Sequence, residues 1–297
     1  MEIGLVKSGV KLDIDWHTKN TAEDIDQAII KYGRYLKNLG IRDATVRTHS
    51  FRVQQFLRWA KDPRPPVEKA TEYREILLDK GLARSSLNNF GFAVRRFYEM
   101  HNLDFTFPFL KPNDTIPYYF TESDVQAIFD AASHHIRDLA MLMTLFYGTL
   151  RASDLCNLDI DDINLQDSTL RIRDGKGGKD AIVFIKYECI QVLRKYLYIR
   201  PDIENNDAVF VTDYGNRWYK TNLYRLFLNY KRKAHVTKPG GLHVFGRHTP
   251  ATLMIAKGCD VSIVQKILRH NDIKTTLRYI HINDKIKRDA YEKYLVL

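Results

Sequence analysis

The chain has 297 residues, of which 44% are hydrophobic and 28% charged, a balance that is ordinary for a globular protein and excludes a disordered or fibrous chain. A chain of this length usually divides into two domains. Its 46 lysines and arginines against 36 aspartates and glutamates give a net charge of +10, so a polyanion such as nucleic acid is the leading class of partner.

The sequence contains no run of roughly eighteen uncharged apolar residues, which a membrane span would need. Its first residues, MEIGLVKSGVKLDIDW, are too charged for a signal peptide, so we expect a cytoplasmic protein. The three cysteines lack C-x-x-C spacing, which favours reduced thiols over disulfides or a zinc site: Cys156, Cys189 and Cys259.

Residues 1 to 20 show no period and are expected to form an arm. From Thr21, apolar residues recur every three or four positions until Gly40, which predicts one amphipathic helix. The same spacing predicts three further helices: 45–61, 68–81 and 85–102. Together they predict a four-helix N-terminal domain over residues 1–105.

Three prolines between positions 104 and 119 interrupt every period, which predicts a linker over residues 106–120 and a second domain over 121–297. The second domain opens with two predicted helices, 121–133 and 136–148. Period-two patterns then predict three short strands, the last two joined by a GKGGK hairpin turn: 159–166, 169–175 and 180–185. From Tyr187 to the end the helical period returns. The predicted fold is mainly α with a small antiparallel sheet.

Four stretches of the second domain carry a resemblance: YGTLRASDLCNL, RIRDGKGGKDAIVFI, GLHVFGRHTPATLMIAKG and ILRHNDIKTTLRYIHI. In this order and at these separations they resemble the tyrosine recombinase, or phage integrase, family, which includes the Xer-type recombinases. The predicted four-helix domain is similar in kind to the family's core-binding domain. The resemblance implies that Tyr279 attacks a DNA phosphate, forming a 3′-phosphotyrosyl bond and releasing a 5′-hydroxyl, with no ATP, metal or other cofactor.

Displacement at a phosphodiester concentrates negative charge on the non-bridging oxygens, and without a metal that charge must meet fixed cations. Guanidinium groups suit this role because they bind phosphate with two donors and stay protonated. Arg151 and Arg247 match the two arginines of the family. Asp154, where the family more often has Glu, is expected to orient Arg151, and His248 follows Arg247 as a supporting residue.

The remaining catalytic positions follow from the same resemblance. Lys176, in the glycine-rich hairpin, is expected to protonate the departing 5′-oxygen, with Lys179 as its rival. His270 matches the next family position, although Arg269 replaces the usual preceding glycine. Tyr279 follows nine residues later, and a turn at 271–272 with a short helix would bring both to one site.

His243 precedes Arg247 by four residues, where the family spacing is three. We expect a local helical bulge to absorb the extra residue, because Gly246 adds flexibility and Pro250 cannot donate to the carbonyl of Gly246. His243 would then still face the site and be able to take the proton of Tyr279.

The first domain offers no catalytic candidate, but it carries helical cations that are expected to contact DNA phosphates: Arg47, Arg52, Arg84, Arg95 and Arg96. The resemblance implies double-stranded DNA as partner and a homotetramer on two recombination sites. Chromosome dimer resolution, viral or plasmid integration and transposition all remain open, as does the target sequence.

Two alternatives remain beside a recombinase. A DNA-binding protein of the same fold with impaired cleavage is supported only by the displaced His243 and the unusual Pro250. A metal-dependent nuclease is disfavoured because few carboxylates cluster near the histidines.

Overall fold

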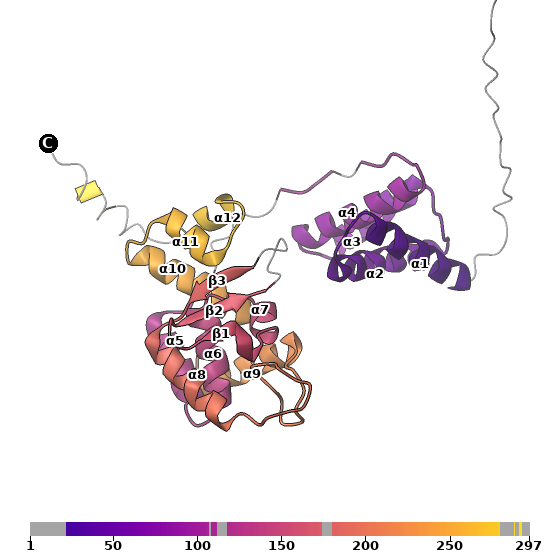
Figure 1. Ribbon diagram of the computed structural model, residues 1–297. Coiled ribbons are helices and arrows are strands. Elements are labelled where there is room, and N and C mark those ends of the chain that lie inside the picture. Colours follow the sequence, from indigo (N-terminus) through magenta and orange to yellow (C-terminus); the bar gives the residue numbers. More distant parts are fainter. Residues whose placement is uncertain are drawn as a thin grey trace, which may run out of the picture. The chain divides into compact units, whose positions relative to one another are not determined.

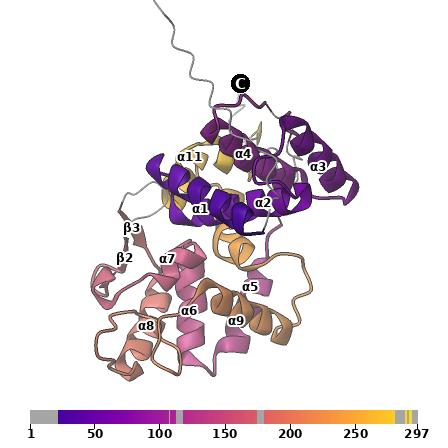
Figure 2. The same cartoon turned by 90° about the vertical axis from the view of Figure 1, so that its right-hand side faces the viewer.

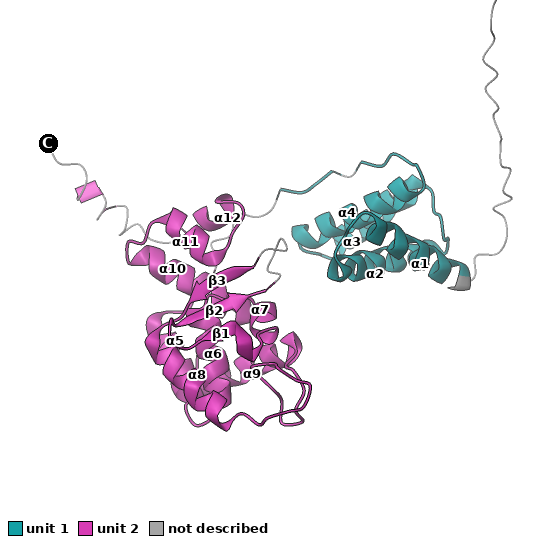
Figure 3. Cartoon of the chain, viewed as in Figure 1, with its two compact units in different colours: residues 1–114 teal, residues 115–297 magenta. Residues whose placement is uncertain are grey.

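The computed structural model describes residues 22–106, 108–111, 118–173, 180–279, 288 and 291–292. The chain forms two compact units, Met1–Asp114 and Thr115–Leu297, which are coloured separately in Figure 3. The division falls within the predicted linker. Within the described ranges, no helix is long and apolar enough to cross a membrane.

Four helices build the first unit (Figure 1): α1 (Ala22–Asn38), α2 (Asp43–Ala60), α3 (Val67–Asp79) and α4 (Arg84–Met100). Gly40 and Gly81 follow α1 and α3 with φ of 72° and 70°, a left-handed conformation that glycine adopts without strain. The apolar stripes of the four helices meet in one core. There the buried hydroxyl of Tyr32 donates to the carbonyl of Ala93 at 2.7 Å.

The helices of the second unit follow in chain order: α5 (Glu122–Ala132), α6 (Ile136–Tyr147), α7 (Ala152–Cys156), α8 (Tyr187–Ile199), α9 (Lys220–Lys233), α10 (Thr249–Ala256), α11 (Val261–Leu268) and α12 (Lys274–Leu277). Thr121 and Asp124 form a capping box that starts α5, where the sequence predicts a helix to begin. α6 lies in the middle of this unit beside α8 (Figures 1 and 2) and is buried from Ala140 to Phe146.

A small sheet of three antiparallel strands in the order β1-β2-β3 confirms the predicted fold class. The strands are β1 (Ile163–Asn164), β2 (Thr169–Ile172) and β3 (Ala181–Phe184). Thr169 pairs with Phe184 and Ile172 with Ala181, so β2 and β3 form the predicted hairpin. This register places the two ends of the glycine-rich turn side by side.

Two predictions about secondary structure are wrong. Residues 159–166 are mostly not a strand, because a 3-10 turn, η1 (Ile160–Asp162), precedes the short β1. The carboxylate of Asp162 accepts the N–H of Asp159 at 3.0 Å and so stabilises the turn. The helical period also does not continue through 200–219. There Arg200 binds the carbonyls of Asn206 and Ala208, and bridges replace a helix.

Candidate active site

Arg247 is the central cation of the candidate site and is only 1% exposed. Its Nη1 donates to the carbonyl of Thr149 at 2.6 Å, and its Nη2 donates to the carbonyl of Leu268. Burial, together with the charges of Arg151 and Arg269, lowers the pKa of Arg247 to about 9. The side chain is therefore still a cation at neutral pH, fixed between two carbonyls far apart in sequence.

The carbonyl of Thr149 accepts from Arg247, and Thr149 has a strained backbone conformation. Its φ is 47°, in the left-handed region that β-branched residues rarely adopt. Such strain costs on the order of 1–3 kcal/mol and persists only where surrounding contacts enforce it. Here the contacts are the hydrogen bond from Arg247 and one from the Thr149 hydroxyl to the carbonyl of Ile267 at 3.4 Å.

The backbone from Val244 to His248 forms a π-turn, η2, directly before α10. The N–H of Thr249 donates to the carbonyl of Val244, five residues back, which is the hydrogen bond of a π-helix. The predicted local bulge is therefore confirmed, and it absorbs the one extra residue between His243 and Arg247. Gly246 is required there, because an added Cβ would lie 2.8 Å from Leu145 Cγ and 3.1 Å from the Leu150 carbonyl oxygen.

Arg151 is the N-cap of α7, and its backbone N–H donates to Asp154 at 3.1 Å. The expected side-chain pair is loose, because Arg151 Nη1 lies 3.9 Å from Asp154 Oδ2. Arg269 Nη2 instead binds the same oxygen at 2.8 Å. Two guanidinium groups thus face one carboxylate, and the charges of both also act on Arg247, an arrangement that attracts an anion.

Tyr279 is 4% exposed and packs among apolar residues of α10 and α11. Its hydroxyl lies 3.0 Å from Nδ1 of His248. Burial raises the pKa of Tyr279, partly offset by Arg247 and Arg278. The tyrosine is therefore a neutral phenol at neutral pH and needs a base before it can attack.

The structure places His248, which the sequence indicated only as supporting, against the tyrosine hydroxyl. Burial and the nearby charges of His243, Arg278 and Arg247 lower the pKa of His248 to about 4. The imidazole is therefore neutral at pH 7, so Nδ1 can accept the phenolic proton. His243 is exposed and meets the His248 ring edge-on, with 4.8 Å between ring centroids. His248 thus stands between His243 and Tyr279, since its ring contacts both of their rings.

His270 is held from both sides. Its Nδ1 lies 2.9 Å from the Thr276 hydroxyl, and its backbone N–H and carbonyl both bind Gln265. The turn at Asn271 and Asp272 leads into α12 as predicted. α12 is a single turn that carries the chain from His270 to Tyr279.

Lys176 and Lys179 lie outside the described residues, but the base of their hairpin is well braced. Arg171 pairs with Asp180 across it at 2.8 Å. Arg173 pairs with Asp162 at 2.6 Å. The expected role of Lys176 stays a prediction.

The cations proposed to bind DNA in the first unit differ in their surroundings. Arg47 is exposed on α2. Arg95 and Arg96 both form ion pairs with Glu99, at 3.0 and 2.7 Å. Exposed ion pairs contribute little stability, so replacing Glu99 by a DNA phosphate as partner would lose little free energy. Arg52 and Arg84 bind carbonyls, those of Ser86 and Lys111. A partly structural role is therefore most evident for Arg52, which is half-buried.

Metal ligands are not grouped in the described part of the chain, where no three His, Cys, Asp or Glu side chains gather to hold an ion. Cys156 and Cys189 are buried free thiols, and Cys259 is a free, half-buried thiol. Burial raises the pKa of Cys156 to about 11 and that of Cys189 to about 12, so neither is a nucleophile at neutral pH.

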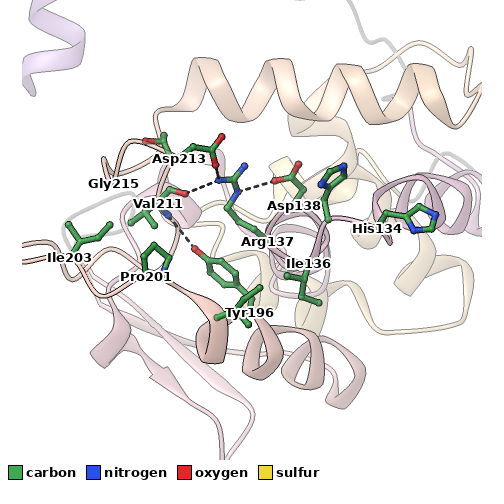
Figure 4. A pocket seen from close by; sticks show the side chains of 13 residues that line it. His134, Ile136, Arg137, Asp138, Tyr196, Pro201, Ile203, Val211, Asp213 and Gly215 are labelled. Atoms are coloured by element: carbon green, nitrogen blue, oxygen red, sulfur yellow. Dashed lines mark hydrogen bonds and ion pairs between the residues drawn. The ribbon is translucent and has the colours of Figure 1, made fainter.

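A separate hollow of about 620 Å³ opens beside Arg137 (Figure 4). Figure 4 shows Arg137 between Asp138 and Asp213, with Tyr196 directed toward Val211. Arg137 forms ion pairs with the two carboxylates at 3.1 and 2.5 Å, and the Val211 N–H donates to the Tyr196 hydroxyl. These groups bind one another, and the described residues that line the hollow include no candidate catalytic residue. The convergence around Arg247 is the better candidate active site.

Sequence reasoning missed two residues of the site, Arg269 and Thr149. Arg269 was noted only as a replacement for glycine, and its φ of 55° shows why glycine suits that position. The signal that could have found it is a bulky cation kept at a helix end that favours a left-handed residue. Nothing in the sequence around Thr149 indicated its contact with Arg247.

The fold is that of the tyrosine recombinases: the phage integrase family matches residues 118–285, and the chain belongs to it. The chain is 30% identical over 282 residues to tyrosine recombinase XerA of Pyrococcus horikoshii, covering 93% of this chain and 96% of XerA. A crystal structure of XerA recombinase is similar with a TM-score of 0.56, at 29% identity, covering 92% of this chain and 99% of that one.

A second solved structure shares the fold at lower identity. The Tn1549 transposon integrase in complex with transposon right-end DNA has a TM-score of 0.71 and 16% identity, covering 91% of this chain and 99% of that one. The family and fold predicted from the sequence are therefore confirmed, and site-specific DNA recombination through a tyrosine nucleophile is the activity of this class.

Proposed function

We propose that Tyr279 is the nucleophile with which this recombinase cleaves and rejoins duplex DNA. Its oxygen attacks the scissile phosphorus, the bond from phosphorus to the 5′-oxygen breaks, and a 3′-phosphotyrosyl bond forms. The observation that carries the proposal is the proximity of the charges of Arg151, Arg247 and Arg269, with Asp154 as the carboxylate that pairs with two of them in the described part of the chain. Such a surplus of fixed positive charge suits the negative charge of a phosphoryl transition state.

The cations and the histidines have different roles in this reaction. Arg247, immobilised by two carbonyls, and Arg151, only loosely paired, hold the non-bridging oxygens. His270 donates to the same phosphate, and Lys176 protonates the departing 5′-oxygen. Because the bond energy is kept in the phosphotyrosyl ester, rejoining needs only attack by a 5′-hydroxyl and no nucleotide cofactor.

His248 is the group best placed to take the proton of Tyr279, because its Nδ1 lies 3.0 Å from the hydroxyl. Its neighbour His243 packs edge-on against the His248 ring. As phosphate binds, its negative charge favours the protonated imidazole and so assists the transfer.

The partner is a double-stranded recombination site, contacted in the first unit by Arg47, Arg84, Arg95 and Arg96, with Arg52 bracing the helices. Active protomers assemble as a homotetramer on two sites in the cytoplasm. Chromosome dimer resolution, viral or plasmid integration and transposition are all compatible with this activity, and the chain is similar both to XerA recombinases and to a transposon integrase.

A nicked suicide substrate, which loses the strand needed for rejoining, tests the proposal. The wild type should accumulate an SDS-resistant protein–DNA adduct in excess EDTA, and Tyr279→Phe should bind the same DNA without forming it. A wild type that binds the site but forms no adduct would support the alternative, a DNA-binding protein with impaired cleavage. An adduct that needs added magnesium would contradict the metal-free mechanism.

A further inference from the structure

Arg269 occupies a position that a side chain adopts only at a cost. It is the C-cap of α11 with a φ of 55°, a left-handed conformation in which glycine is favoured. A residue that opposes the local backbone preference must be kept for what its side chain does.

The side chain of Arg269 reaches Asp154, 115 positions away in the sequence. Its Nη2 lies 2.8 Å from Asp154 Oδ2, and the two side chains are 15% and 7% exposed. A charge-assisted hydrogen bond of this length in a largely buried place is strong. It connects the start of α7 with the segment that leads to His270 and Tyr279.

The same carboxylate oxygen is the one nearest to Arg151. Arg151 Nη1 stands 3.9 Å from Asp154 Oδ2, beyond hydrogen-bond distance. Arg269 has therefore taken the acceptor that a guanidinium three residues away would otherwise occupy. As a result, Asp154 forms only a long ion pair with the guanidinium of Arg151 and no hydrogen bond.

The ion pair with Asp154 leaves two hydrogen-bond donors of Arg269 unsatisfied. Its Nε and Nη1 are buried without a hydrogen-bond partner in the described part of the chain. Burial also lowers the pKa of Arg269, with Asp154 opposing this effect and Arg151 adding to it. A pair kept only for stability would leave fewer buried donors unmet.

We propose that Arg269 is a positioning residue: by holding Asp154, it keeps the guanidinium of Arg151 available to the scissile phosphate. This inference rests on the proposed function of Arg151.

Arg269→Gly tests the proposal, because glycine relieves the left-handed strain and so does not threaten folding. With Arg269 gone, Asp154 should draw in Arg151, and single-turnover cleavage should slow about ten- to hundredfold while DNA affinity and Tm stay near those of the wild type. Arg269→Lys should recover part of the rate. Adding Asp154→Asn to Arg269→Gly removes the competing carboxylate and should restore most of it.

Arg269→Gly with wild-type cleavage would overturn the proposal, as would a slow variant that Asp154→Asn does not improve. A structural measurement is independent of activity: in crystals of Arg269→Gly, the Arg151 guanidinium should move within hydrogen-bond distance of Asp154. An Arg151–Asp154 separation still near 3.9 Å in this variant would contradict the inference. Failure of the wild type to form an adduct would instead count against the proposed function alone.

Discussion

The hydroxyl of Tyr279 and Nδ1 of His248 lie 3.0 Å apart, joining residues that are 31 positions apart in sequence. The contact depends on the π-turn, since His248 is the last residue of η2 and Pro250 follows in the first turn of α10. A nucleophile and a neutral base at hydrogen-bond distance form the geometry that activates a hydroxyl.

His248→Gln should slow single-turnover cleavage by about a hundredfold, because an amide can accept a hydrogen bond but cannot take the proton. DNA affinity, measured by gel shift, should not change. His243→Gln is the matched control and should slow cleavage less. His243 contacts the His248 ring, whereas the Tyr279 hydroxyl lies against His248 itself. A larger loss for His243→Gln would assign the base to His243 instead.

Stability should also depend on His248 between about pH 4 and 6.5. Its folded pKa of about 4 is below its ordinary value of 6.5, so in this window the unfolded chain binds a proton that the folded chain does not. Stability therefore falls as the pH falls, by at most about 2 kcal/mol from pH 7 to pH 5. Urea unfolding at both values should show a smaller loss in His248→Gln; an identical loss would exclude this linkage.

Arg247→Ala should raise the activation free energy of the chemical step by about 3 kcal/mol or more, by comparison with loss of a preorganised oxyanion donor. It should also destabilise the fold, because the carbonyls of Thr149 and Leu268 lose their buried donor. Arg247→Lys restores the charge but cannot bind both carbonyls with one planar group. In rapid-quench assays the cleavage rate should fall from wild type to Arg247→Lys and again to Arg247→Ala. Equal rates for wild type and Arg247→Lys would show that binding both carbonyls with one guanidinium does not matter for cleavage.

Gly246→Ala should destabilise the second unit by about 1–3 kcal/mol, because its Cβ would meet Leu145 and the Leu150 backbone at the π-turn. Gly33→Ala is the control. A Cβ at Gly33, inside α1, would lie 3.7 Å from Ser50 Oγ of α2, an ordinary van der Waals distance, so stability should hold or rise. Thermal unfolding compares the two variants, and an unaffected Gly246→Ala would mean that the turn has room for a side chain.

The sequence predicted most of this fold because its helices follow local rules. The 3-4 apolar spacing, the capping box at Thr121 and the glycines after α1 and α3 are all local signals. The four-residue spacing of His243 and Arg247, with Gly246 and Pro250 around it, was enough to predict the bulge. Strand 159–166 failed because its aspartates bind the nearby backbone rather than a neighbouring strand.

The candidate site was less predictable where it depends on long-range contacts. The carbonyls that hold Arg247 come from Thr149 and Leu268, and backbone groups have no residue-specific signal. The pairing of Arg269 with Asp154 joins two helices that only the tertiary fold brings together. The choice between His243 and His248 likewise depends on how the π-turn rotates each ring.

Phosphate binding by the first unit should show in the salt dependence of DNA affinity. Arg47→Ala should lower the slope of log K against log salt by about 1, because one counterion fewer is released. Arg52→Ala should instead lower the Tm, since Arg52 is half-buried and joins α2 to Ser86 of α4. A Tm loss with an unchanged salt slope for Arg47→Ala would contradict its role at the DNA backbone.

The identity of the residue that carries the DNA tests the account most directly. Trypsin separates three C-terminal tyrosines into different peptides: YIHINDK for Tyr279, DAYEK for Tyr291 and YLVL for Tyr294. Mass spectrometry of the adduct from a suicide substrate, digested with trypsin and nuclease, should find the 3′-phosphonucleotide on YIHINDK. A nucleotide on DAYEK or YLVL, with YIHINDK unmodified, would contradict Tyr279 as the nucleophile.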